Sequence, residues 1–182
     1  MEEIAAGLHD SGVRFLWVAR GDNSWLRQSS VKGGFVVRWC EQLRVLCHSS
    51  IGGFLSHSGW NSTLEALFAG VPMLTFPIYF DQTPNSKQVA EDWKVGWQAK
   101  RGVGSDIIVG REEIAEIVRR FMNSESNEGK ELRKNMKDAK EICRTAIADG
   151  GSSVNNLNAF LQDVLQKKVS CAGTQRPINS PS

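Results

Sequence analysis

The segment from Trp39 to Gln82 holds most of the side chains that could bind a ligand. It contains an aromatic residue at its start, a histidine (His57) directly before a predicted helix, a glutamate (Glu65) early in that helix, and a terminal Asp81-Gln82 pair. An aromatic ring offers a flat surface to a base, helix amides bind phosphate, and a carboxylate accepts hydrogen bonds from ribose hydroxyls. Together these residue types favour a nucleotide-activated sugar as the ligand.

The start of the predicted helix is the best candidate for holding a diphosphate. Helix N-termini carry unpaired backbone N–H groups and about half a unit of positive charge. Gly59 would let a phosphate approach the backbone, and Asn61, Ser62 and Thr63 add side-chain donors. His57 can also donate a hydrogen bond, which makes it the best phosphate candidate among the three histidines of the chain.

Each of these residues also has a purely structural interpretation. Ser62-x-x-Glu65 matches a capping box, in which both side chains bond to the amides of their own helix. A histidine at a strand end is more often a structural residue, and Trp39 and Trp60 fit a hydrophobic core. The Asp-Gln pair could cap the helix that follows it. Only the joint spacing of these residues favours the ligand.

Strand and helix patterns alternate around this segment. Apolar runs rich in β-branched and aromatic residues predict strands at 13–19, 34–37, 51–55, 71–76 and 95–99. Helical spacing predicts helices at about 1–9, around 43–47, and at 62–68 and 84–93, with Gly12 and Gly70 as helix stops. This alternation indicates an α/β fold with a parallel sheet and helices on both faces, in which ligands bind beyond the carboxyl ends of the strands.

The chain becomes purely helical after Gly110. Ile114, Ile117, Val118 and Phe121 repeat at helical spacing. A longer amphipathic helix follows, carrying Leu132, Met136, Ala139, Cys143 and Ile147 and ending at Gly150-Gly151, and a last helix carries Val154, Leu157, Phe160, Leu161 and Val164. The tail at 167–182 is rich in Ser, Pro and Gly, and we expect it to be disordered.

Composition excludes several classes of function. The net charge of +2 comes from 22 basic and 20 acidic residues scattered along the chain, so no basic face for nucleic acid is expected. The four cysteines form no CxxC pair, no Asp-x-Asp cluster suggests a metal, and no apolar run is long enough to span a membrane. We therefore expect a cytoplasmic chain with a small-molecule partner and no membrane or metal.

A nicotinamide-binding module is an alternative, because Gly102-Val-Gly104 resembles part of a dinucleotide fingerprint. The third glycine is absent and the stretch opens no helix, so a loop explains it better.

The whole segment resembles the signature box of plant family-1 UDP-dependent glycosyltransferases. The matching positions are Trp39, Gln42, Val45-Leu46, His48, Gly52-Gly53-Phe54, the block from Ser56 to Thr63, Glu65, Gly70-Val71-Pro72, Pro77 and Asp81-Gln82. The flanking stretches MEEIAAGL, FLWVAR and NSKQVAEDWKVG are similar to the same family. One departure is Cys40-Glu41, where most of the family has Ala-Pro. Loss of that proline removes a constraint on the turn beside the base.

The resemblance implies a fold and a role for each matching residue. Residues 1–166 would be the Rossmann-like, donor-binding C-terminal half of a GT-B architecture, without its first strand. Trp39 would stack on uracil, Gln42 would lie near the nucleoside, and Glu65 would accept from the ribose. The diphosphate would lie on His57, Asn61 and Ser62, beside Gly59, and the sugar on Trp60, Asp81 and Gln82, the last favouring UDP-glucose.

The resemblance also implies that catalysis needs more than this chain. The family is metal-independent and inverting, and its general base belongs to an N-terminal domain that also binds the acceptor. None of His9, His48 and His57 matches that base, so no catalytic residue is predicted. We expect the chain alone to bind UDP-sugar weakly and to transfer no sugar. The alternative is a non-catalytic, truncated donor domain that acts on a partner or self-associates through its exposed interdomain face.

Overall fold

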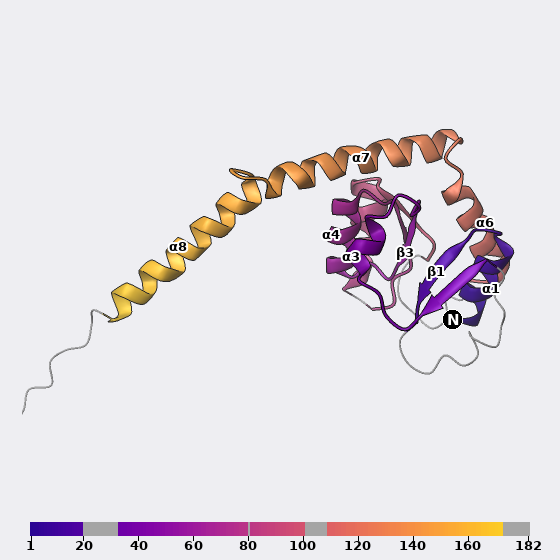
Figure 1. Cartoon of the computed structure of the whole chain (residues 1–182), viewed down its shortest axis with the longest axis horizontal. Coiled ribbons are helices and arrows are strands. Elements are labelled where there is room, and N and C mark those ends of the chain that lie inside the picture. The colour runs from indigo at the N-terminus through magenta and orange to yellow at the C-terminus, as the bar shows by residue number, and fades with distance from the viewer. Residues whose placement is uncertain (20–32, 80, 101–108, 173–182) are drawn as a thin grey trace, which may run out of the picture. The chain divides into compact units, whose positions relative to one another are not determined.

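The computed structural model describes residues 1–19, 33–79, 81–100 and 109–172, and the side chains of 167–172 are not described. The chain divides into two compact units, Met1–Lys140 and Glu141–Ser182. The first contains every described strand and the candidate site (Figure 1). The Gly102-Val-Gly104 stretch lies outside the described residues.

Helices and strands follow the predicted order. The first unit begins with α1 (Glu2–Asp10), β1 (Phe15–Val18), β2 (Gly34–Val37), α3 (Gln42–Leu46), β3 (Phe54–Ser56), α4 (Trp60–Ala69) and β4 (Met73–Thr75). It continues with α5 (Gln82–Lys87), the π-helix η1 (Gln88–Asp92), β5 (Gly96–Gln98) and α6 (Arg111–Met122). The last two helices are α7 (Asn127–Ile147), which crosses the boundary between the units, and α8 (Ser152–Ala172). The α/β class is confirmed.

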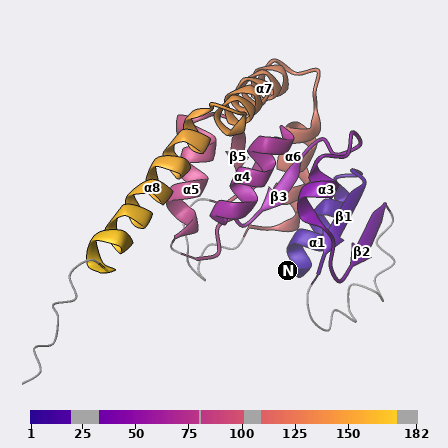
Figure 2. The same ribbon diagram turned by 60° about the vertical axis from the view of Figure 1, so that its left-hand side comes forward.

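The described strands form two parallel ladders rather than one continuous sheet. β1 pairs with β2, and β3, β4 and β5 pair in that order. In Figure 2, β1 lies between β3 and β2. Side chains still join the two ladders, because Phe15 and Trp17 of β1 pack against the same core cluster as Leu55 of β3. The predicted parallel arrangement is correct, but hydrogen bonding between β1 and β3 is absent from the described part.

Helix α6 supplies much of the core. Its residues Ile114, Val118 and Phe121 are buried, as the helical spacing predicts, and they pack with Leu8 of α1 and Leu74 of β4. Burial of each large side chain contributes about 1.5–3 kcal/mol of transfer free energy. The helix thus holds α1 and the second ladder against one another.

A close contact and an ion pair fix α1 against α6. A Cβ at Gly7 would lie 2.6 Å from the Cβ of Ile114, so only glycine allows this approach. Arg111 Nη2 donates to Glu3 Oε1 at 2.6 Å and Arg111 Nε donates to Glu3 Oε2 at 3.0 Å. These hydrogen bonds lower the pKa of the Glu3 carboxyl.

The last helix extends further than predicted. α8 runs to Ala172, so residues 167–172 are helical where disorder was expected. The sequence KKVSCA contains no helix breaker, and the first Gly and Pro of the tail come later, at Gly173 and Pro177. Residues 173–182 lie outside the described part. Within the described residues, no helix combines the length and apolarity that crossing a membrane requires.

The end of α4 depends on Gly70 and Lys140. Gly70 adopts a left-handed conformation with φ +77°, and its N–H bonds to Ala66 O and Leu67 O, as in a glycine C-cap. Lys140 Nζ donates to Ala69 O at 2.7 Å, where a lysine also complements the helix dipole. The helix therefore ends at the predicted residue, and a side chain distant in sequence, that of Lys140, binds a carbonyl of its last turn.

Gly70→Ala should therefore lower the free energy of unfolding by more than Gly12→Ala. Both positions have positive φ, +77° and +73°, so each alanine costs roughly 1 kcal/mol of backbone strain. A Cβ at 70 would also lie 2.6 Å from Lys140 Cδ, whereas nothing lies within 4 Å of a Cβ at 12. Chemical denaturation of the two variants measures the difference.

The double variant Gly70→Ala/Lys140→Ala serves as the control. It removes the clash and should be destabilised by less than the sum of its two single variants. Equal losses for the two glycine variants would contradict the contact between Lys140 and the end of α4.

Candidate functional site

The turn between β3 and α4 is strained and held on two sides. Ser58 has φ +66°, which is uncommon for a residue other than glycine and costs of order 1 kcal/mol. Its N–H donates to Ser56 Oγ at 3.1 Å, and its carbonyl accepts from Asn85 Nδ2 at 3.0 Å. Ser58 Oγ is buried and has no hydrogen-bond partner among the described residues. Tertiary contacts therefore fix the conformation that leads into α4.

The N-terminus of α4 is open. Its N-cap is Gly59, which makes no side-chain cap, and helical bonding starts with Thr63 N donating to Gly59 O at 3.0 Å. No described residue accepts a hydrogen bond from the amides of Trp60, Asn61 or Ser62. Three adjacent N–H groups at the positive end of a helix form a site suited to an anion.

His57 lies against this open end. A Cβ placed on Gly59 would come within 2.6 Å of His57 Nε2, so the imidazole packs against the glycine backbone. His57 is exposed, which leaves it accessible to a ligand in solvent. A Cβ at position 59 would displace the imidazole from this place, which the position of Gly59 before a helix did not reveal.

The capping-box interpretation of Ser62 and Glu65 is wrong. α4 begins two residues before Ser62, and neither side chain caps it. Instead, Gln42 Nε2 at the start of α3 donates to Glu65 Oε2 at 2.7 Å and to Ser62 Oγ at 3.1 Å. Three residues predicted to serve the same ligand therefore meet at the contact between α3 and α4.

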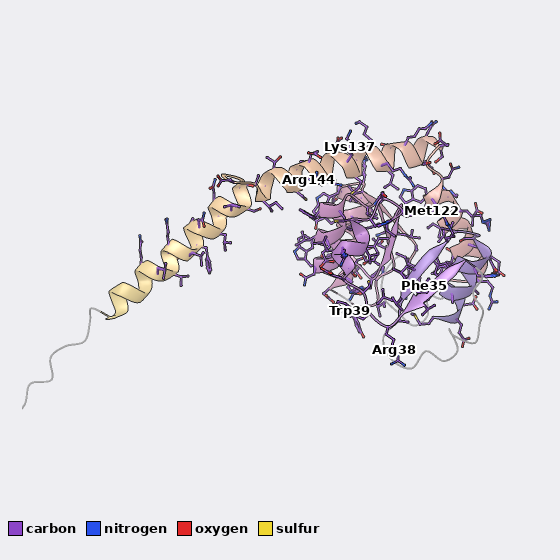
Figure 3. All side chains as sticks on the ribbon, viewed as in Figure 1. Phe35, Arg38, Trp39, Met122, Lys137 and Arg144 are labelled. Carbon is purple, nitrogen blue, oxygen red and sulfur yellow. The ribbon has the colours of Figure 1, made fainter. Side chains whose placement is uncertain are left out.

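The two tryptophans of the segment are not core residues. Trp39 is 69% exposed and lies on the connection between β2 and α3 (Figure 3). Trp60 is 45% exposed and packs on Trp93, with the ring centroids 6.2 Å apart. Exposed indoles are available to stack on a ligand.

Asp81 and Gln82 differ from one another. Asp81 is exposed and precedes α5 without a side-chain cap. Gln82 is buried, and its Oε1 accepts from the N–H of Ile78 at 2.8 Å and of Tyr79 at 3.0 Å. Gln82 therefore orders the loop after β4, a structural role the sequence did not predict, and its carbonyl oxygen is already engaged.

Two polar contacts that the sequence did not predict connect α5 to the rest of the site. Asn85 bonds to the strained turn at Ser58, and Ser86 Oγ lies 2.7 Å from Thr75 Oγ1 of β4 inside the protein. A single Ser or Asn gives no periodic signal in a sequence, so only the place of these two residues inside the matching flank NSKQVAEDWKVG indicated them. Through these hydrogen bonds α5 is joined to β4 and to the turn before α4.

No three His, Cys, Asp or Glu side chains of the described residues gather in a way that could hold a metal ion. The amides at the start of α4, His57 and the Gln42–Glu65 pair are groups that can bind an anion and hydroxyl groups.

Known proteins match both the sequence and the fold. A family model described as "UDP-glucoronosyl and UDP-glucosyl transferase" matches residues 1–146. UDP-glycosyltransferases 87A2 and 87A1 of Arabidopsis thaliana are 52% and 50% identical over 166 residues, which cover 90% of this chain and 36% and 38% of those proteins. The chain thus spans little more than a third of their length.

Solved structures agree with the sequence match. The structure of Os79 from O. sativa in complex with UDP has a TM-score of 0.80 and 36% identity, and covers 89% of this chain and 36% of that chain. Medicago truncatula UGT71G1 complexed with UDP-glucose has a TM-score of 0.76 and 36% identity over 89% of this chain and 36% of that one. The fold is that of the C-terminal domain in these plant GT-B structures. The relatives named here are plant proteins, and the chain therefore belongs to the UDP-glucuronosyl and UDP-glucosyl transferase family.

Proposed function

We propose that the chain binds a UDP-sugar, with UDP-glucose favoured, in the cytoplasm, as the donor-binding part of an inverting glycosyltransferase that acts on a small-molecule hydroxyl. The observation that supports this most is the open N-terminus of α4 beside His57. The diphosphate would accept hydrogen bonds from the amides of Trp60, Asn61 and Ser62 and from His57. Relatives whose structures contain UDP and UDP-glucose share this fold.

The remaining parts of the donor have matching groups nearby. Glu65 would accept from the ribose hydroxyls with the carboxylate lone pairs that Gln42 leaves free. The exposed indole of Trp39 would stack on uracil, and Trp60, Asp81 and the amide nitrogen of Gln82 would face the sugar. The preference for glucose rests on Gln82 and on the family resemblance.

The same groups would assist departure of UDP. When the bond from the anomeric carbon to the diphosphate breaks, negative charge grows on the leaving oxygen, and helix amides with His57 would stabilise it. Deprotonation of the acceptor hydroxyl needs a general base. In this proposal His57 serves the diphosphate, and the family resemblance assigns the base to another domain. In this proposal the present chain binds the sugar donor, and another domain binds the acceptor.

His57→Ala should weaken UDP binding about 10- to 100-fold, the loss of one hydrogen bond to a charged group. Isothermal titration calorimetry with UDP and with uridine measures it, and uridine affinity should change little because it lacks the diphosphate. Gly59→Ala should have a similar effect, since its Cβ would displace the imidazole.

His9→Ala is the matched control, because His9 is an exposed histidine on α1. It should leave both affinities unchanged. A His57→Ala variant that loses affinity for uridine and UDP equally would show that His57 does not contact the diphosphate. NAD titrated alongside should show no binding, and tight NAD binding would favour the dinucleotide alternative.

The purified chain should bind UDP-glucose yet transfer no sugar to a flavonoid-like hydroxyl acceptor, because the proposal assigns the general base for the acceptor to another domain. Mass spectrometry of the acceptor after long incubation measures this. Product formation that His57→Ala abolishes would refute the division between donor and acceptor parts.

An exposed apolar face supports the alternative of self-association. Leu16 and Phe35 are register partners on β1 and β2, and they are 38% and 68% exposed, next to Val18 at 40%. Exposed apolar clusters favour association. Sedimentation velocity should show a concentration-dependent dimer that Phe35→Glu weakens, and a strictly monomeric wild-type chain at high concentration would exclude this.

A further inference from the structure

The hydrogen bonds of β1 leave one of its edges without a partner. The N–H groups of Phe15 and Ala19 donate to carbonyl oxygens on the side of β2. In a parallel ladder, alternate residues of a strand bond to opposite sides. The N–H and C=O groups of Leu16 and Val18 therefore point away from β2, and no described strand pairs with them.

β3 also has a free edge. The N–H of Phe54 and the carbonyl of Ser56 both bond to backbone on the side of β4. Leu55 lies between them, so its N–H and C=O point the other way, where no described strand pairs with them. In Figure 2, β1 lies between β3 and β2, so the free edge of β1 is the one on the side of β3.

Side chains of β1 and β3 reach one core although the two backbones do not pair. Phe15 and Trp17 of β1 and Leu55 of β3 are partly buried and pack against the core cluster to which α6 contributes. Directly paired strands lie about 4.8 Å apart and bond to one another. Two strands that share a core but exchange no hydrogen bonds in the described part are arranged as neighbours of one further strand between them.

The side chains around these edges are apolar on both sides of the ladder. Successive side chains of a strand point to opposite sides, so Leu16 and Val18 lie on the side away from the core cluster. They are 38% and 40% exposed. A strand between β1 and β3 would therefore have apolar neighbours on both of its faces. Parallel strands covered on both faces are near-continuous apolar runs rich in Val and Ile, and a segment of that kind fits this place.

We propose that β1 and β3 form a docking site for a single strand of another polypeptide. The strand is an extended apolar segment of about five residues, a common strand length and close to the four residues of β1. It bonds to both free edges and joins the two ladders into one sheet. In such strand addition, main-chain hydrogen bonds supply affinity and side-chain pockets supply selectivity. The site goes beyond donor binding and does not require that the chain bind a UDP-sugar.

The test uses the full chain and the fluorescein-labelled peptide KKVIVIVKK, whose terminal lysines keep the apolar centre soluble. Fluorescence anisotropy should show saturable binding. The control peptide KKVIPIVKK has the same charge, but its proline lacks the central N–H and does not fit a central strand, so it should bind at least about 10-fold more weakly. Absence of binding, or equal binding of the two peptides, would overturn the proposal.

Hydrogen exchange measured by NMR locates the bound peptide. The peptide should slow exchange of the amides of Leu16, Val18 and Leu55, which point to the free edges. Protection of Val36 alone would mean that the peptide adds to the outer edge of β2, and the proposal would be wrong. Protection of the first three amides at high protein concentration without peptide would mean that a second copy of the chain occupies the site, which also overturns the proposal.

Val18→Pro and Val36→Pro are matched variants on the two outer edges of the first ladder. The odd-numbered residues of both strands carry the bonds between β1 and β2, so neither proline removes one of them. Val18→Pro should weaken the peptide at least about 10-fold, because its ring occupies the free edge, whereas Val36→Pro should leave the affinity almost unchanged.

Circular dichroism melts report whether each variant is folded. A folded Val18→Pro chain that binds the peptide as tightly as the wild type would overturn the proposal. If Val18→Pro does not fold, the exchange pattern of the wild-type chain and its discrimination between the two peptides decide the proposal.

Discussion

The open N-terminus of α4 is the constraint on which the rest of the site depends. A helix start leaves amides that need acceptors, and side chains normally supply them. Here Gly59 has no side chain, Ser62 lies inside the helix, and its hydroxyl accepts from Gln42. The helix therefore begins without a cap of its own, and its positive end stays available to an anion.

Neighbouring elements keep this end in one conformation. The turn before α4 contains a residue with positive φ, Ser58, which is stable only because Ser56 and Asn85 hold its backbone. Asn85 belongs to α5, and α5 is tied to β4 by the buried bond between Ser86 and Thr75. Binding groups on helices that are fixed in this way are placed more precisely than groups on a free loop.

The ladder arrangement explains why these helices can meet. β3 and β4 are adjacent and parallel, so α4 and α5 start from the same edge of the ladder. α3 packs directly on α4, which brings Gln42 to Glu65 across 23 positions of sequence. Most of the site is thus produced by parallel strand pairing together with short connections.

Local pattern predicted a large part of this fold. The helical spacing of Ile114, Val118 and Phe121 identified the buried face of α6, and Gly70 marked the end of α4 because few other residues tolerate a positive φ. The boundaries of the helices and strands were predicted less accurately. β3 and β4 are shorter than predicted, α8 is longer than predicted, and the strands form two ladders, since strand pairing depends on partners far away in the chain.

By itself the sequence determined the order of elements, the family and the set of candidate binding residues, because periodicity, turn residues and motif spacing are local properties. Only the tertiary structure decided what each polar side chain bonds to. It showed that Ser62 and Glu65 accept from Gln42 instead of capping their helix, that Gln82 orders its own loop, and that Trp39 and Trp60 are exposed. A hydrogen bond joins atoms that are close in space, and sequence spacing does not fix that distance.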